Sequence, residues 1–276
     1  MRLQAQDRSL RNQNRYAIAL PTYVLQSDLC IHRKIAAAKT EDRMSSIEHL
    51  VHYRNNGFNE VQGWCSEALF DTVALLDSVD INKHGGCLEI GVHHGRFYLL
   101  LNQVISASAT SYAVDIFDSQ HLNIDLSGAG SLKIFEDNLA RFDVHKGANT
   151  QIVIGDSTDP ALRLREIVGD NPLRFISVDG GHTVEHTISD LVLANDLISN
   201  EGVVILDDIL NYHWLGVIEG VGRFLDRRPT LVPFAIGHNK LYMAKISFRS
   251  FYHDLFANSP MNTKIVNFYG HSVVAL

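Results

Sequence analysis

The feature that most constrains the fold is a series of short apolar runs that each end on a polar or acidic residue. Five of them follow one another along the chain: GCLEIGV, SYAVDIF, TQIVIGDS, LRFISVD and GVVILDD. Between them lie stretches with helical spacing of apolar residues, such as LKIFEDNLARF and TVEHTISDLVLANDLI. Continuous apolar strands that alternate with helices form a parallel sheet covered on both faces.

Two further runs, TLVPFAIG and KLYMAKISF, follow the last helical stretch and are joined through HNK. A connection this short joins only antiparallel neighbours. We therefore predict an α/β fold with a Rossmann-like, doubly wound and mostly parallel sheet that ends in an antiparallel hairpin. Residues 61–250 form this domain, preceded by a helical arm over 1–60 and followed by an extension over 251–276.

The start and end of the chain read differently from the domain. Ser45 or Ser46, with Glu48 close behind, is typical of a helix N-cap inside the predicted arm. The arm and the C-terminal extension are candidates for an interface in a homo-oligomer. The first twenty residues lack the apolar run of a signal peptide or a membrane span, so no membrane association is expected.

Composition excludes several function classes. Lys and Arg together number 24 against 31 Asp and Glu, and no basic run stands out, so we expect no nucleic-acid binding. Apolar residues make up 46% of the chain, enough to fill a core and too many for a disordered protein. The three cysteines are widely spaced and form neither a disulfide framework nor a zinc pattern, which favours reduced thiols in a cytoplasmic protein.

Ligands of open α/β sheets bind beyond the carboxyl ends of the strands. The first strand ends LEIGVHHGRF, where Gly91 and Gly95 bracket a turn that leads into a helix, and Glu89 precedes the turn. Glycines at such a turn let the backbone approach a ligand closely. An ordinary strand-to-helix turn is the alternative.

Acidic residues also end the next two strands. Asp115 ends the second, where a carboxylate accepts hydrogen bonds from a ribose, and Asp156 and Ser157 end the third. Any one of these acids could be a loop cap. The presence of acids at the ends of successive strands favours a shared ligand-binding role over chance placement.

The order LEIGVHHGRF, VDIFD, IGDS resembles the class I S-adenosylmethionine-dependent methyltransferases over residues 60–250. The EIGVxxGRF pattern looks similar to a subgroup of small bacterial enzymes that act on sugars or secondary metabolites. The resemblance implies a seven-stranded sheet whose last strand is antiparallel. His93 stands where many members have the middle glycine, and this departs from the family pattern.

The resemblance also implies roles for the acids and glycines at the strand ends. Glu89, Gly91 and Gly95 would lie on the methionine side of the cofactor. Asp115 would bind the ribose, and Asp156, with Ser157 beside it, would approach the adenine.

Two further strands end in aspartates: Asp179, and the adjacent pair Asp207 and Asp208. Neighbouring strands lie about 4.8 Å apart, so these carboxylates are expected to gather at one rim. A divalent cation would remove their mutual repulsion, and oxygen ligands suit Mg²⁺. The resemblance implies the same ligands, because metal-dependent O-methyltransferases of this fold place carboxylates at these two strand ends. The alternative is that the aspartates cap helices or bind substrate without a metal.

His182 follows Asp179 after a DGGH turn and is a candidate general base, because an imidazole near neutral pKa accepts a proton from a hydroxyl. A helix cap or a surface histidine is the alternative. His186, one turn further on, is expected to be structural. Asn211, His213 and Trp214 are candidates for an acceptor wall.

The sequence therefore predicts a methyltransferase that moves the methyl group of S-adenosylmethionine to a hydroxyl of a small molecule or sugar, with Mg²⁺ as a second cofactor. Asp179 and His182 are the predicted catalytic residues. A hydroxylase-like enzyme on the same fold is one alternative. An NAD-dependent oxidoreductase is another, although GVHHGR lacks the GxGxxG pattern of that class. A non-catalytic protein that kept the fold is the third.

Overall fold

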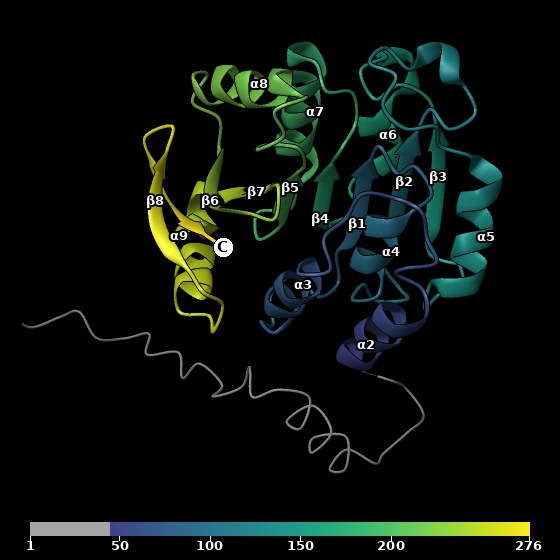
Figure 1. Cartoon of the computed structure of the whole chain (residues 1–276), viewed down its shortest axis with the longest axis horizontal. Coiled ribbons are helices and arrows are strands. Elements are labelled where there is room, and N and C mark those ends of the chain that lie inside the picture. The colour runs from purple at the N-terminus through teal and green to yellow at the C-terminus, as the bar shows by residue number, and fades with distance from the viewer. Residues whose placement is uncertain (1–44) are drawn as a thin grey trace, which may run out of the picture. The chain divides into compact units, whose positions relative to one another are not determined.

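A computed structural model describes residues 45–276. These residues form a nine-stranded sheet with the order β3-β2-β1-β4-β5-β7-β6-β9-β8. Figure 1 shows the strands in this sequence from the right of the view, beginning with β3, to the left, where β8 lies. The strands are β1 (Gly86–Ile90), β2 (Ser111–Asp115), β3 (Thr150–Ile154), β4 (Leu173–Val178), β5 (Val203–Leu206), β6 (Leu231–Gly237), β7 (Lys240–Lys245), β8 (Lys264–Phe268) and β9 (His271–Ala275).

Strands β1 to β5 pair in parallel, as their continuous apolar composition indicates. Strand β7 lies antiparallel between β5 and β6, and β9 pairs in parallel with β6 and antiparallel with β8. Because the carboxyl ends of β1 to β5 all lie at one edge of the sheet, residues that directly follow these strands are brought together there.

Helices cover both faces of the sheet. One apolar layer packs side chains of α2, α3, α4, α5 and α9 against the strands, and the opposite layer packs α6, α7 and α8. The helices are α2 (Ser46–Asn56), α3 (Leu69–Asp77), α4 (Arg96–Asn102), α5 (Leu132–Phe142), α6 (Leu164–Val168), α7 (Val184–Leu197), α8 (Leu215–Leu225) and α9 (Ile246–Ala257), with short 3₁₀ turns η1 (Gln120–Leu122) and η2 (Pro160–Leu162). Within residues 45–276, no helix is both long and apolar enough to cross a membrane.

The predicted fold class is confirmed, whereas the expected number of seven strands is wrong. The seven predicted strands are present as β1 to β7. The C-terminal segment adds β8 and β9, which extend the same sheet, and the end of the predicted last strand is instead the start of α9 at Ile246. The apolar residues of this segment alternate only weakly along the sequence, and the edge of β6 supplies the pairing that organises them.

The predicted cap before α2 is confirmed. The Ser45 side chain accepts the Glu48 N–H, and the Glu48 carboxylate accepts the Ser45 N–H at 2.6 Å, which is a capping box. The rest of the predicted N-terminal arm, residues 1–44, lies outside the described residues. The domain boundaries therefore stay predictions.

Candidate active site

A cavity of about 700 Å³ opens at the carboxyl ends of β1 to β5. Its volume is within the range of small-molecule and cofactor sites. Eight of the ten predicted site residues line it: Gly91, Asp115, Asp156, Ser157, Asp179, His182, Asp207 and Asp208. The other two, Glu89 and Gly95, are not among its lining residues. The acids predicted at the strand ends thus face one shared space.

Gly91 brings β1 against the end of β4. Its φ is +82°, and a Cβ placed there would lie 1.8 Å from the carbonyl oxygen of Asp179. Only glycine fits, for both reasons. Two residues later His93 also takes a left-handed φ of 53° and donates its N–H to Asp115 Oδ2 at 2.7 Å. His93 thus adopts a left-handed backbone conformation that glycine reaches more easily than other residues.

Asp115 and Asp156 line the part of the cavity next to Gly91. The second oxygen of Asp115, Oδ1, accepts the N–H of Phe117 at 2.6 Å. Burial raises the pKa of Asp115, although the N–H groups that it accepts oppose the shift. Asp156 accepts both the N–H and the hydroxyl of Thr158 through Oδ1 at 2.8 Å, so its Oδ2 is the oxygen left to other partners.

Glu89 and Gly95 have different surroundings from those predicted. Glu89 is buried in β1, where Oε1 accepts the Ser177 hydroxyl at 2.8 Å and Oε2 has no partner among the described residues. Burial raises the pKa of Glu89 to about 8, although Lys240 opposes the shift. Gly95 precedes α4 with φ +90°, and a Cβ there would meet the ring of Phe135 at 2.8 Å. Gly95 therefore serves packing in this structure.

The acidic end of the cavity holds three aspartates in different environments. Burial and the neighbouring Asp207 raise the pKa of Asp179 well above its ordinary value. Asp207 accepts a hydrogen bond from the buried Lys240 through Oδ2 and the N–H of Asp208 through Oδ1. Asp208 takes a left-handed φ of 59°, and its Oδ1 accepts amide N–H groups of Asn211 and Asn239.

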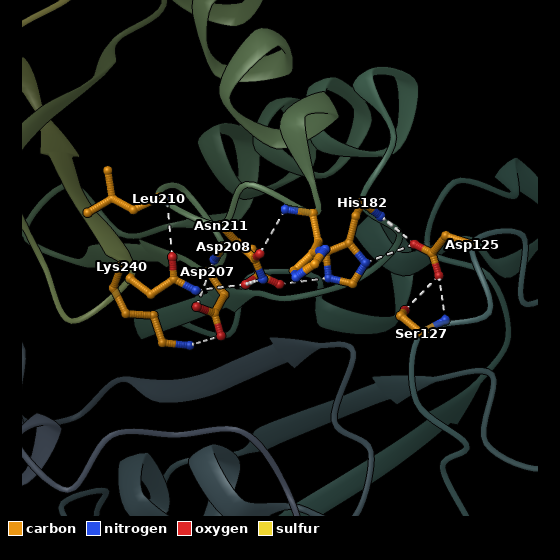
Figure 2. A network of polar contacts seen from close by, with 10 residues as sticks. Asp125, Ser127, His182, Asp207, Asp208, Leu210, Asn211 and Lys240 are labelled. Atoms are coloured by element: carbon orange, nitrogen blue, oxygen red, sulfur yellow. Dashed lines mark hydrogen bonds and ion pairs between the residues drawn. The ribbon is translucent and has the colours of Figure 1, made fainter.

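His182 bridges two carboxylates, as Figure 2 shows. Its Nδ1 lies 2.8 Å from Asp125 Oδ2, and its Nε2 lies 2.9 Å from Asp208 Oδ2. The His182 N–H also donates to Asp125 at 2.7 Å, and the ring stacks on Trp214 with 4.4 Å between centroids. Burial works against the charged ring, but the hydrogen bonds to Asp208 and Asp125 outweigh it and raise the pKa of His182.

The roles suggested for the neighbouring residues divide. Trp214 lines the cavity beside His182, and Asn211 lines it while holding Asp208. His213 is exposed and is not among the lining residues. His186 also lines the cavity, where its Nδ1 contacts the Thr183 hydroxyl at 2.9 Å, and the structural role expected of it stays a prediction.

Sequence reasoning missed Lys240 and Asn239, which the β6–β7 hairpin brings to the acidic end. His238 and Asn239 form its two-residue turn with φ of 54° and 65°. Positive φ at both central residues is the type I′ geometry, in which asparagine is favoured. The letters GHNK between two apolar runs carried this signal. Asp125 was also left without a role, because nothing near it in sequence indicates His182.

Comparison with known proteins identifies the domain. Residues 88–209 match the family model described as a methyltransferase domain. This segment is a methyltransferase domain. The match includes every predicted site residue from Glu89 to Asp208, and it confirms the enzyme class predicted from the sequence. No curated protein matches the chain.

Several solved structures align with most of this chain at low sequence identity. An O-methyltransferase from Bacillus cereus in complex with SAH shares 15% identity, with 78% of this chain and 96% of that one covered and a TM-score of 0.49. The O-methyltransferase TomG from Streptomyces achromogenes shares 15% identity, with 78% of this chain and 95% of that one covered and a TM-score of 0.49. CalS11, a TDP-rhamnose 3′-O-methyltransferase of calicheamicin biosynthesis, shares 13% identity, with 72% of this chain and 92% of that one covered and a TM-score of 0.47. Likeness at this level leaves substrate and cofactor to be argued from this chain's own residues.

The predicted magnesium ligands fit a metal only in part. Asp179, His182 and Asp208 each offer an atom, and these atoms lie within 4.8 Å of one another. Asp207 is not in this group, and both of its oxygens accept hydrogen bonds, one from Lys240 and one from the Asp208 N–H. The set of three carboxylates predicted from the sequence therefore does not come together around one point.

Proposed function

We propose that the protein transfers the methyl group of S-adenosylmethionine to a hydroxyl oxygen of a small molecule, for which a sugar is the first candidate. One observation carries the proposal. A single cavity within a methyltransferase domain joins the acids suited to a nucleoside, Asp115 and Asp156, to the cluster of Asp179, His182 and Asp208. Cofactor and acceptor would therefore meet inside one shared cavity.

The residues around Gly91 fit the cofactor. Asp115 is a half-buried carboxylate at the end of β2, and its oxygens, which accept the N–H groups of His93 and Phe117, keep acceptor capacity for a ribose hydroxyl. Asp156 and Ser157 would border the adenine, and Gly91 the methionine. Glu89 and Gly95 do not line the cavity, and we propose that they support the turn around Gly91 that would border the methionine. The bound cofactor would supply a methyl group activated by its sulfonium charge.

We further propose that His182 receives the proton of the acceptor hydroxyl. Asp125 holds Nδ1, so the proton would arrive at Nε2, and Asp125 would stabilise the imidazolium that forms. The acceptor would enter between Nε2 and Asp208, whose carboxylate now occupies that nitrogen. Asp179, with its raised pKa, would hold the hydroxyl in position. Because the pKa of His182 is raised, turnover is expected to increase with pH.

Trp214 would form the wall against which a sugar or aryl ring of the acceptor packs. The magnesium ion, the cytoplasmic location and the homo-oligomer inferred from the sequence stay predictions. A hydroxylase-like reaction would use the same carboxylates and yield no methylated product, so product analysis separates it from this proposal.

Calorimetric titration tests the cofactor. We expect one-site binding of S-adenosylmethionine and no heat with NAD. Asp115→Asn should weaken binding by about tenfold or more, since a hydrogen bond to a charged group is worth about 1.5–3 kcal/mol. Asp137→Asn, on the exposed surface of α5, is the matched control and should bind as the wild type does. Absence of heat with S-adenosylmethionine would refute the proposed function.

A further inference from the structure

The pairing of Lys240 with Asp207 follows from the register of the sheet. Strands β5 and β7 are antiparallel, with Leu206 opposite Leu241. The next pair of positions toward the cavity is therefore Asp207 and Lys240. Their side chains meet there, and the Lys240 Nζ donates to Asp207 Oδ2 (Figure 2). The contact is fixed by two strands rather than by a mobile loop.

This ion pair is enclosed. Lys240 is 1% exposed and Asp207 is 8% exposed, although both border the cavity. The Lys240 Nζ also lies 4.4 Å from the ring centroid of Phe97, and a cation is stabilised by the face of an aromatic ring. Removing one member of a buried pair leaves the other charge uncompensated, which is strongly unfavourable. Lys240 is thus a permanent part of the site.

The Lys240 ammonium group supplies positive charge at the acidic end of the cavity. Asp207 contacts this ammonium group directly. The charge of Lys240 also acts to lower the pKa of Asp179 and of Glu89, against the effect of burial. A divalent cation on Asp207 would have to displace Lys240 or bind beside it against like-charge repulsion. Of the remaining candidates Asp179, His182 and Asp208, two already contact each other, because His182 Nε2 lies 2.9 Å from Asp208 Oδ2, and a cation in this group would have to separate them.

We propose that Lys240 is the resident cation of this site and holds Asp207 in place of a divalent metal, so that catalysis proceeds without one. The proposal rests on the proposed methyl transfer for its consequence in catalysis, and on the Lys240–Asp207 pair for its structural part. Lys240 is a positioning residue: it fixes the Asp207 carboxylate and compensates the charge of the acids around it.

Binding of Mn²⁺, followed by electron paramagnetic resonance, tests the structural part without any need for turnover. Wild-type protein should leave Mn²⁺ free in solution. Lys240→Met removes the ammonium group at nearly constant volume and should create one Mn²⁺ site per chain. The double variant Lys240→Met/Asp207→Asn should lose that site again. Lys245→Met makes the same substitution at the far end of β7, where Nζ contacts Asn195, and should behave as the wild type does.

Thermal unfolding of the same samples provides the second measurement. Lys240→Met should be less stable than the wild type, because Asp207 is left buried without a counter-ion, and Mn²⁺ should restore part of the lost stability. The double variant removes both charges, so its stability should not respond to Mn²⁺. A Lys240→Met protein that gains neither the Mn²⁺ site nor this stabilisation would overturn the proposal.

Mn²⁺ binding to the wild type gives a further test, which does not depend on how Lys240→Met folds. Stoichiometric Mn²⁺ binding that disappears in Asp207→Asn would show that the metal uses Asp207, and it would refute the proposal. Methylation that persists in excess EDTA is expected, and methylation abolished by EDTA and restored by Mg²⁺ would also refute it. Titration with S-adenosylmethionine keeps the two proposals apart. Cofactor binding together with a metal site on Asp207 would refute only the role of Lys240, whereas a lack of cofactor binding would refute the proposed function.

Discussion

At the scale of single residues, the site is organised by where each acid finds its donor. Glu89 accepts one hydroxyl and leaves Oε2 without a partner among the described residues. Asp125 and Asp208 hold the two nitrogens of His182. Burial raises the pKa of Glu89 to about 8 although Lys240 and the Ser177 hydroxyl oppose the shift, whereas hydrogen bonds, above all from the His182 N–H, overcome burial and lower the pKa of Asp125 to about 2. Glu89 and Asp125 thus differ in protonation at neutral pH.

Glu89 should make the stability of the protein depend on pH. The folded chain binds this proton more tightly than the unfolded chain, so the free energy of unfolding should fall as pH rises from about 4.5 toward 8. Glu89→Gln, which still accepts the Ser177 hydroxyl, should remove up to about 4 kcal/mol of this loss between pH 5 and pH 8. Urea unfolding of both proteins at the two pH values measures it. Equal losses in both would contradict the raised pKa.

The acids at the strand ends could be read from the sequence, and their partners could not. Asp115, Asp179 and Asp207 each directly follow an apolar run, and a parallel sheet brings such ends to one edge. Lys240 lies 33 residues after Asp207, and only the register of β5 against β7 puts the two side by side. Register depends on the turn and on the packing of the whole sheet, and no local pattern reports it.

At the scale of elements, the turn from β1 to α4 shows why a glycine was a sound signal even with His93 in the middle of the motif. Gly91 has no room for a side chain, because the backbone carbonyl of Asp179 lies against it where β4 ends. His93 needs only a left-handed backbone, which a histidine adopts at modest cost. The sequence therefore indicated a close crossing at Gly91, while His93 gave the motif an unfamiliar form.

Two alanine substitutions separate the cost of the backbone conformation from the cost of crowding. Gly91 and Gly270 have similar φ angles of +82° and +78°, but nothing lies within 4 Å of a Cβ at Gly270. Gly270→Ala should cost about 1–2 kcal/mol, the usual penalty of a left-handed residue. Gly91→Ala should cost more than about 4 kcal/mol, because β1 or β4 must move. Urea unfolding compares them, and similar losses would show that the crossing is not tight.

At the scale of the whole molecule, the predicted C-terminal extension continues the sheet with β8 and β9. Strand β9 pairs with β6, and its Val273 and Val274 are fully buried. Arg249 on α9 donates to carbonyl oxygens of both strands, those of Pro233 and Ser272. Periodicity missed this arrangement because β8 and β9 are short and partly exposed, and because an edge strand takes its order from the neighbour it pairs with.

Removal of residues 260–276 should therefore destabilise the domain without altering the cavity. Loss of β9 uncovers the edge of β6 and the apolar surface that two buried valines cover, which amounts to about 3–6 kcal/mol. An uncovered edge also pairs with other chains, so the truncated protein should aggregate on mild heating. None of the removed residues lines the cavity, so the fraction that stays folded should bind S-adenosylmethionine with unchanged Kd.

Ile265→Thr, at a side chain on β8 that is 55% exposed, is the control and should unfold as the wild type does. Light scattering and urea unfolding measure these effects, and a truncated protein as stable as the full chain would mean that the sheet ends functionally at β6.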